Sequence, residues 1–555
     1  MQTNLCRKVP TEDGINLATD VYLPDGSGPF PVILVRTPYH RVDQEGIAPT
    51  FVSRGYALVA QDCRGKYDSE GEFTPLVYEK VDGQAAVDWI ANQKWCNGRV
   101  GLWGRSYLGI VQVPAACGGH EALKCMAPSV APGSYFRDWI RYDGCFAVGN
   151  AIRWSLTHGS CRNQPPMSHF EWDELHPLQS IQAIAERVGF ETPHLRQWAE
   201  HDQYDEYWAA IDQSLMHEHI RIPGYHVGGW FDHLTRSQYE AYQNIRDRGA
   251  TELARSSQRL LIGPWGHTTT GNTGPEHCRY GEWDFGNDAD LSVMAHELQF
   301  FDHYMKDLDN GYSEQPPVKL FLMGENRWVT FEDWPPPEAR IHSYFLDSNG
   351  SANMRIGDGS LKQDAPEKSA ADSFDYDPAD PVPTSGGATY WGLPLVGPID
   401  QRPILDRSDV LYYRSDKLSA PLTVVGEVNL ALNISTDAED TDFIAKLCVE
   451  EPNGAITCLT LGSLRCRYRN SWSEPEPLSP GEVTPIRIQL GHTAYVFPEG
   501  SRIGLMVTSS DFPRIQPHPN RIASPWSLAE PVTARNSVAH GPGALSRLDL
   551  PIVDS

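Results

Sequence analysis

The sequence lacks the long apolar runs that a membrane protein needs. No stretch of its 555 residues approaches the 18 consecutive apolar residues of a membrane-spanning helix. The first eight residues, MQTNLCRK, also lack the apolar core of a secretory signal peptide. We therefore expect a cytoplasmic protein that does not act at a membrane.

Positive charge and clustered cysteine are also scarce. The chain has 46 Lys and Arg against 72 Asp and Glu, a net charge of −26, and no basic run that would offset repulsion by a phosphate backbone. Its eleven cysteines are scattered and include no CxxC pair. Structural zinc and thiol redox chemistry both need clustered thiolates. We therefore expect reduced thiols, no metal site and no nucleic-acid partner.

What is present is the composition of a folded protein. Hydrophobic residues make up 40% of the chain, charged residues 21% and aromatic residues 10%. Disordered chains have fewer apolar and more charged residues. The length predicts two to four domains.

The first two thirds of the chain follow an α/β pattern with an interruption. Continuous apolar runs at 31–36 and 56–60 are typical of strands buried on both faces of a parallel sheet. From 138 to 221 the periodicity is helical, most clearly over 204–215, and strand patterns then resume. This predicts an α/β domain made of residues 1–137 and 222–340, split by a helical cap at 138–221.

The last third is predicted to be all-β. From 341 to 555, short strands such as 422–425 and 428–432 alternate with turns rich in Asp, Gly, Pro and Ser. Short strands at this spacing are typical of a sandwich or jelly roll.

The most specific motif surrounds Ser106. The segment from Gly101 to Gly109, GLWGRSYLG, leads from a predicted strand through a small-residue turn into a helix, as in a nucleophile elbow. Glycines fit there because a sharply bent backbone leaves no room for side chains beside the serine. The next backbone N–H, that of Tyr107, can then face a developing oxyanion. The pattern departs from G-x-S-x-G at position 108, so by itself it also fits an ordinary strand-to-helix turn.

A serine nucleophile needs a histidine to take its proton and an acid to orient that histidine. In α/β folds with a nucleophile elbow, the serine, the acid and the histidine each follow a strand, in the chain order Ser, Asp, His. Asp232 follows a strand and a glycine pair, and His267 follows the next strand. Each has a structural alternative, since Asp232 could cap a helix and His267 could pack in a loop. His233 is a second histidine beside Asp232.

These blocks resemble those of the family that contains bacterial cocaine esterase and X-prolyl dipeptidyl peptidases, together with α-amino acid ester hydrolases and glutaryl acylases. The similarity extends over nearly the whole chain. Besides the segments that hold Ser106, Asp232 and His267, the matching motifs lie at 9–14, 18–24, 36–39, 61–65, 301–304, 380–383, 440–443 and 509–513.

The resemblance implies an α/β-hydrolase domain with an inserted helical cap and a C-terminal all-β jelly-roll domain. It implies that Ser106 is the nucleophile, that His267 is the general base and then acid, and that Asp232 orients His267. It also implies that the Tyr39 hydroxyl joins the Tyr107 backbone N–H in the oxyanion hole. Such a mechanism needs no metal and no organic cofactor.

Pocket residues are harder to predict. The cap contains four tryptophans that are mainly expected in its core, namely Trp139, Trp154, Trp172 and Trp198, and we expect Trp139 to contact the substrate. Outside the cap, Asp62 and Arg64 are expected to form an internal ion pair that braces their loop.

The sequence therefore predicts a serine esterase that acts on a small molecule through an acyl-enzyme on Ser106. An alternative is an amide-cleaving X-Pro dipeptidyl peptidase or acylase with the same triad. A third hypothesis, from another class, is a binding protein whose elbow is a relic. The jelly roll could also pair two subunits as a homodimer.

Overall fold

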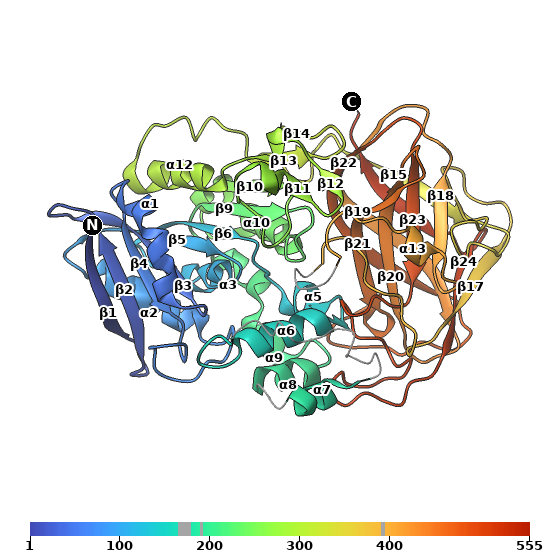
Figure 1. The fold of residues 1–555 in the computed structure, drawn as a ribbon, viewed down its shortest axis with the longest axis horizontal. Helices are drawn as coiled ribbons and strands as arrows, with labels where there is room; N and C mark the ends of the chain where they lie inside the picture. The colour runs from blue at the N-terminus through green and yellow to red at the C-terminus, as the bar shows by residue number, and fades with distance from the viewer. Residues whose placement is uncertain (165–178, 189–192, 390–394, 555) are drawn as a thin grey trace.

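A ten-stranded sheet forms the N-terminal half of the protein (Figure 1). The computed structural model describes residues 1–164, 179–188, 193–389 and 395–554. In spatial order the strands are β1 (Gln2–Pro10), β2 (Asn16–Leu23), β4 (Ala57–Asp62), β3 (Phe30–Thr37), β5 (Cys96–Arg105), β6 (Leu123–Ser129), β9 (Gly224–Gly229), β10 (Gln258–Gly263), β13 (Val318–Leu322) and β14 (Arg327–Phe331). The seven central strands, from β4 to β13, are parallel, so their carboxyl ends meet at one edge.

Helices cover both faces of this sheet. The helices on one face are α2 (Glu79–Ala91), α4 (Gln112–Ala116) and α10 (Arg236–Arg248), and those on the other are α1 (Ala48–Val52) and α12 (Val293–Lys306). Every residue of β4 is buried, and so is all of β3 except its first residue. The continuous apolar runs of the sequence are therefore explained by burial on both faces.

The segment between β6 and β9 is mainly helical and lies below the sheet in Figure 1. In the described residues its elements are α5 (Tyr135–Asp138), β7 (Arg141–Tyr142), β8 (Cys145–Phe146), α6 (Val148–His158), α7 (Ile181–Val188), α8 (Pro193–Glu200), α9 (Glu206–Ile211) and the 3₁₀ turns η3 (Gln213–Leu215) and η4 (His217–His219). The helix expected over 204–215 ends at residue 211, because Asp212 is extended and its carboxylate accepts the N–H of Ser214 instead. Trp172 lies outside the described residues.

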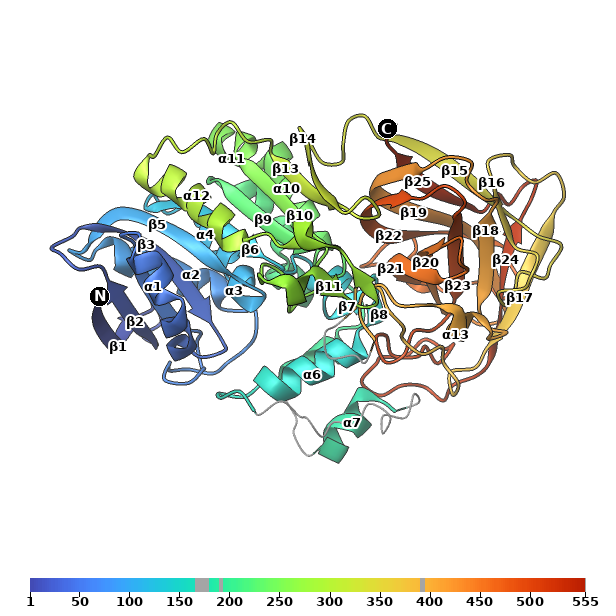
Figure 2. The same ribbon diagram turned by 45° about the horizontal axis from the view of Figure 1, so that its top comes forward.

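The C-terminal domain is built mainly of β-strands (Figure 2), and in the described residues these form one eleven-stranded sheet. They are β15 (Arg340–Asp347), β16 (Ser360–Lys362), β17 (Ala370–Tyr376), β18 (Leu411–Ser415), β19 (Leu422–Thr436), β20 (Asp442–Glu450), β21 (Ile456–Arg465), β22 (Thr484–Phe497), β23 (Arg502–Thr508), β24 (Ala534–His540) and β25 (Arg547–Ile552). The expected strands at 422–425 and 428–432 are one strand, β19, which continues through Gly426 and a β-bulge after Val428. The predicted fold class is confirmed: an α/β-hydrolase sheet domain followed by an all-β domain.

None of the helices in the described residues is long and apolar enough to cross a lipid bilayer.

Asp202 joins the helical segment to the C-terminal domain. Its carboxylate accepts a hydrogen bond from Arg141 Nη1 at 3.1 Å and another from Arg467 of the C-terminal domain. The Tyr468 hydroxyl donates to the Asp202 backbone carbonyl. Arg141 is fully buried and Arg467 is 2% exposed, so Asp202 neutralises charge that water does not reach.

We expect Asp202→Ala to destabilise the protein by about 3 kcal/mol, because removing one partner of a buried ion pair leaves the other charge uncompensated. Thermal unfolding followed by circular dichroism measures the change. The matched control is Asp375→Ala, which removes an ion pair with Arg535 whose side chains are 65% and 60% exposed and should cost less than about 1 kcal/mol. Equal shifts for both variants would contradict the anchoring role of Asp202.

Candidate active site

Ser106 occupies a strained turn between β5 and the helix α3 (Tyr107–Ile110). Its backbone has φ 56° and ψ −126°, a combination that costs a non-glycine residue about 1–3 kcal/mol. The Ser106 N–H donates to the carbonyl of Ser129 on β6 at 2.9 Å. The Ser106 carbonyl accepts the N–H groups of Gly109 and Ile110 at 2.8 and 2.9 Å. These hydrogen bonds hold the serine in its strained conformation.

Two glycines make this turn possible. A Cβ atom on Gly104, whose φ is 146°, would lie 2.4 Å from Cβ of Leu108. A Cβ atom on Gly109 would lie 2.8 Å from Cβ of Ala131. Side chains at these positions would therefore push α3 away from the sheet, which is the steric reason expected from the sequence.

Ser106, His267 and Asp232 form a continuous line of hydrogen bonds. His267 Nε2 lies 3.0 Å from Ser106 Oγ, and His267 Nδ1 lies 2.9 Å from Asp232 Oδ2. The three residues follow β5, β10 and β9, whose carboxyl ends meet at one edge of the sheet. The structure thus brings together the three residues that the sequence motifs select.

The surroundings of Asp232 keep it ionised. Burial alone would raise the pKa of this carboxyl, but the neighbouring His267 ring and the Leu234 N–H bring the pKa below its usual value. The Leu234 N–H donates to Oδ1 at 2.7 Å, which leaves Oδ2 for His267. A buried anion in this position can orient an imidazole and stabilise the cation that it becomes.

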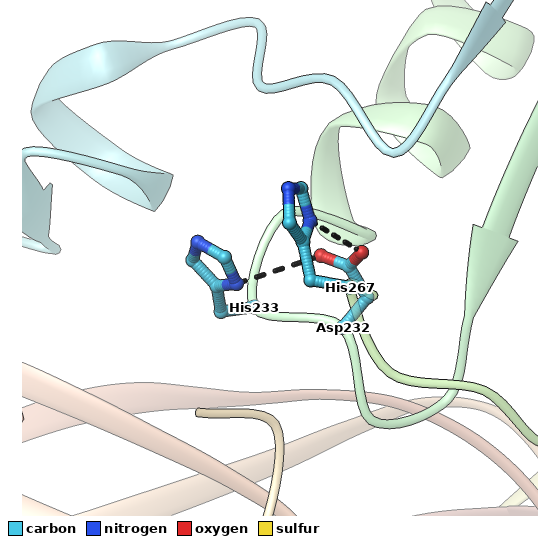
Figure 3. Close-up of side chains that lie close together, drawn as sticks. All are labelled: Asp232, His233 and His267. Atoms are coloured by element: carbon cyan, nitrogen blue, oxygen red, sulfur yellow. Dashed lines mark hydrogen bonds and ion pairs between the residues drawn. The ribbon is translucent and has the colours of Figure 1, made fainter. Parts of the chain in front are cut away.

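Two histidine rings approach the Asp232 carboxylate, one at each oxygen (Figure 3). His233 Nδ1 lies 3.7 Å from Oδ1, and burial lowers the pKa of His233 to about 3, so this ring is neutral at physiological pH. Of the two, His267 is the histidine that also meets Ser106. The histidine predicted from the sequence, His267, is therefore the one of the two that lies within hydrogen-bond distance of Ser106.

Atoms of Asp232, His233 and His267 that could ligate a metal lie within 4.8 Å of one another. Two ligands of a tetrahedral zinc ion lie about 3.3 Å apart, given bonds of about 2.0 Å. Oδ2 of Asp232 and Nδ1 of His267 are closer than that, at 2.9 Å, which is the separation of a charge-assisted hydrogen bond. We therefore interpret this pair as part of a hydrogen-bonded triad.

Tyr39 and Tyr107 are the two tyrosines that the sequence predicts for the oxyanion hole. Tyr39 follows β3, and its hydroxyl accepts a hydrogen bond from the Trp154 indole N–H at 3.3 Å. The neighbours of this hydroxyl include Ser106 and the Tyr107 backbone N–H. Burial raises the pKa of Tyr39, so the phenol keeps its proton and can donate it. The Tyr107 backbone N–H belongs to the residue after the serine, as the elbow motif predicts.

The Glu79 carboxylate binds the Tyr107 hydroxyl, and no sequence motif indicates this residue. The Tyr107 hydroxyl donates to Glu79 Oε1 at 2.8 Å and accepts the Leu76 N–H at 2.8 Å. Glu79 Oε2 in turn lies 2.7 Å from Nη1 of Arg36, with side chains 5% and 1% exposed. No spacing motif connects residues 36, 79 and 107, so only the folded chain reveals this buried network.

The predicted pair of Asp62 and Arg64 is wrong. Asp62 binds Arg41 at 2.6 Å, and Arg64 binds Asp82 at 2.6 Å. The loop is braced by buried ion pairs as expected, but each partner comes from another segment of the chain.

Aromatic side chains of the helical segment pack beside Ser106. Trp154 stacks on the Tyr107 ring with centroids 5.8 Å apart, and Trp139 meets Trp154 edge-on at 5.3 Å. Trp198 continues the cluster, 5.9 Å from both Trp139 and Trp154. Trp139, the predicted substrate contact, is 4% exposed and belongs to the hydrophobic cluster that includes Tyr107.

Comparison with known proteins places the chain among its relatives. Residues 13–269 match the X-Pro dipeptidyl-peptidase (S15 family), and residues 310–549 match the X-Pro dipeptidyl-peptidase C-terminal non-catalytic domain. The chain is 34% identical to cocaine esterase from Rhodococcus sp. (strain MB1 Bresler), and the alignment covers 98% of this chain and 97% of that protein.

Solved structures share the fold over their full length. An aminopeptidase from the marine sediment archaeon Thaumarchaeota archaeon superposes with a TM-score of 0.85 at 25% identity, covering 100% of this chain and 96% of that one. An α-amino acid ester hydrolase superposes with a TM-score of 0.85 at 24% identity, covering 99% and 96% of the two chains, which shows the common fold.

An α/β-hydrolase is recognised by a parallel sheet whose strand ends present a serine, an aspartate and a histidine in that chain order, and this protein has that arrangement. Together with its relatives, this arrangement identifies the protein as a serine hydrolase. The chain belongs to the X-Pro dipeptidyl-peptidase (S15) family, the family that contains cocaine esterase and that its motifs resemble.

We expect Gly104→Ala to destabilise the protein by about 3 kcal/mol or more, because it adds both a steric clash and backbone strain. The matched control is Gly98→Ala, since Gly98 also has a positive φ, 81°, but has open space around its Cβ position. The control should cost about 1 kcal/mol from strain alone. Thermal unfolding of the two variants separates the contributions, and equal losses would show that crowding at the elbow is unimportant.

Buried histidines near the site should make the protein sensitive to acid. Burial lowers the pKa of His158 to about 4 and the pKa values of His194 and His233 to about 3. Below pH 6.5 the unfolded chain takes up protons at these residues that the folded protein does not. Stability therefore falls between pH 6.5 and about 4, by up to about 1.4 kcal/mol per pH unit for each histidine.

Urea unfolding at pH 7 and pH 5 tests this expectation. In His194→Gln the unfolding free energy should depend less steeply on pH, because about one proton fewer is taken up on unfolding. His219→Gln is the control, because the His219 side chain is 59% exposed. An unchanged slope in His194→Gln would refute the assignment.

Proposed function

We propose that the protein hydrolyses carboxylic esters of small molecules through an acyl-enzyme on Ser106. The observation that carries the proposal is the unbroken chain of hydrogen bonds from Ser106 through His267 to Asp232, at 3.0 and 2.9 Å. The 34% identity with cocaine esterase supports an ester as the substrate.

Acylation begins when His267 Nε2 takes the Ser106 hydroxyl proton and Oγ attacks the ester carbonyl carbon. The carbonyl oxygen becomes negatively charged and is held by the Tyr39 hydroxyl and the Tyr107 N–H. Asp232 stabilises the imidazolium. His267 then gives its proton to the alkoxy oxygen, the C–O bond breaks and the alcohol leaves.

Deacylation repeats these steps with water. His267 takes a proton from the water molecule, whose oxygen attacks the acyl carbon, and the same two donors hold the second oxyanion. The imidazolium then returns the proton to Ser106 Oγ as the acid product leaves. His267 is thus base and acid in each half-reaction.

The packing of Trp139, Trp154 and Trp198 beside the serine favours an apolar pocket for one side of the ester. We propose that Trp139 contributes to this pocket.

Cleavage of an amide is the second candidate. The same triad can acylate on an amide if His267 protonates the departing amine. Two findings favour testing it: the family is named after an X-Pro dipeptidyl-peptidase, and an aminopeptidase shares the fold over the full chain.

Turnover of p-nitrophenyl acetate, butyrate and octanoate, beside Ala-Pro-p-nitroanilide, tests the proposal. We expect ester turnover, with kcat reduced at least about 10⁴-fold in Ser106→Ala and to a similar extent in Asp232→Asn. Ser53→Ala is the control, because Ser53 is an exposed residue whose hydroxyl donates to the Thr50 carbonyl.

Activity that survives in a folded Ser106→Ala would refute the nucleophile assignment. Serine-dependent turnover of the anilide with little ester hydrolysis would instead assign the protein as a peptidase.

A further inference from the structure

Trp154 contacts both residues of the proposed oxyanion hole, although it belongs to the helical segment rather than to the sheet. Trp154 lies on α6 and is 5% exposed. Its indole Nε1 donates a hydrogen bond to the Tyr39 hydroxyl at 3.3 Å. The same indole is nearly parallel to the Tyr107 ring, with centroids 5.8 Å apart and an interplanar angle of 10°.

The direction of the Trp154–Tyr39 hydrogen bond is unambiguous. An indole N–H can only donate, so the Tyr39 oxygen must be the acceptor. Because the indole N–H occupies a lone pair of the Tyr39 oxygen, the phenol keeps its own hydrogen free for another acceptor. In the proposed mechanism that acceptor is the carbonyl oxygen of a substrate, where negative charge develops.

Accepting a hydrogen bond also makes a hydroxyl a stronger donor, because neighbouring hydrogen bonds polarise one another in a low-dielectric site. The indole N–H lowers the pKa of Tyr39, although burial has the larger effect and raises the pKa. Trp154 therefore acts on both the direction and the strength of the donor.

The indole is held firmly enough for such a role. Its ring is packed by Trp139 at 5.3 Å, His158 at 5.6 Å and Trp198 at 5.9 Å, besides Tyr107. A donor fixed by aromatic neighbours needs little reorganisation when charge appears.

We propose that Trp154 is a positioning residue of the oxyanion hole, whose indole N–H orients and polarises the Tyr39 hydroxyl. This inference rests on the proposed function. It adds a group from the helical segment to the catalytic apparatus, and that group acts through Tyr39 rather than on the substrate.

The test is a double-mutant cycle with p-nitrophenyl butyrate. Trp154→Phe keeps an aromatic ring but removes the N–H. We expect kcat to fall about tenfold with KM changed less than about twofold, as for the loss of one hydrogen bond that matters in the transition state. In a Tyr39→Phe background the same substitution should change kcat less than about twofold, because the hydroxyl that it positions is gone.

Trp208→Phe is the matched control. Its indole is also buried in the helical segment, but its Nε1 donates to the His201 carbonyl at 2.8 Å rather than to Tyr39. We expect its kcat to stay within about twofold of the wild type.

The cycle separates the possible outcomes. A tenfold loss that is the same with and without the Tyr39 hydroxyl would overturn the proposal, and so would a rise in KM alone, which indicates a wall of the substrate pocket. Full activity in Tyr39→Phe beside an inactive Ser106→Ala would refute the oxyanion role of Tyr39 itself. Activity in Ser106→Ala would instead refute the proposed function.

If Trp154→Phe does not fold, the indole can be replaced at position 154 by benzothienylalanine through stop-codon suppression. This side chain has the shape of tryptophan but carries sulfur in place of the N–H. The same tenfold loss in kcat is expected, and an unchanged kcat would overturn the proposal.

Discussion

The backbone conformation of Ser106 is the constraint on which the rest of the site depends. With φ at 56°, the serine leaves the end of β5 so that Oγ meets His267 while the next N–H, that of Tyr107, turns toward the same space. A relaxed residue here would separate the proposed nucleophile from the proposed oxyanion donor. The strained conformation persists because the Ser129 carbonyl on β6 accepts the Ser106 N–H and because Gly104 leaves room for α3. Contacts with the sheet therefore offset the cost of the strain.

Behind this turn lies an unusual amount of buried charge. Arg36, Glu79 and the Tyr107 hydroxyl form a network from which water is excluded. Apolar residues of similar size are often equally or more stabilising at such places, so stability alone does not explain the network. Its geometric effect is clearer: it fixes the Tyr107 side chain from one end, while Trp154 stacks on the ring. The residue that presents the backbone donor is therefore fixed on two sides.

Much of this arrangement could be predicted from the sequence. Strands such as β3 and β4 were recognisable because burial on both faces requires unbroken apolar runs, and Ser106, Asp232 and His267 because each follows a strand. What could not be predicted depends on contacts between distant segments. Glu79 has no motif, Asp62 and Arg64 each found a different partner, and the direction of the Trp154 N–H depends on how α6 packs.

The anchoring of the helical segment has a consequence for how the protein is made. Asp202 can pair with Arg467 only after a further 265 residues have been synthesised, which takes roughly 10 to 50 seconds at ordinary elongation rates. The N–H groups of Ile181 and Gln182 bond to carbonyls of Pro525 and Trp526, which are synthesised 344 residues later. The sheet can form early on the ribosome. The helical segment that carries Trp139, Trp154 and Trp198 makes its contacts with the C-terminal domain later. A nascent chain with its sheet complete is thus still an unfinished enzyme.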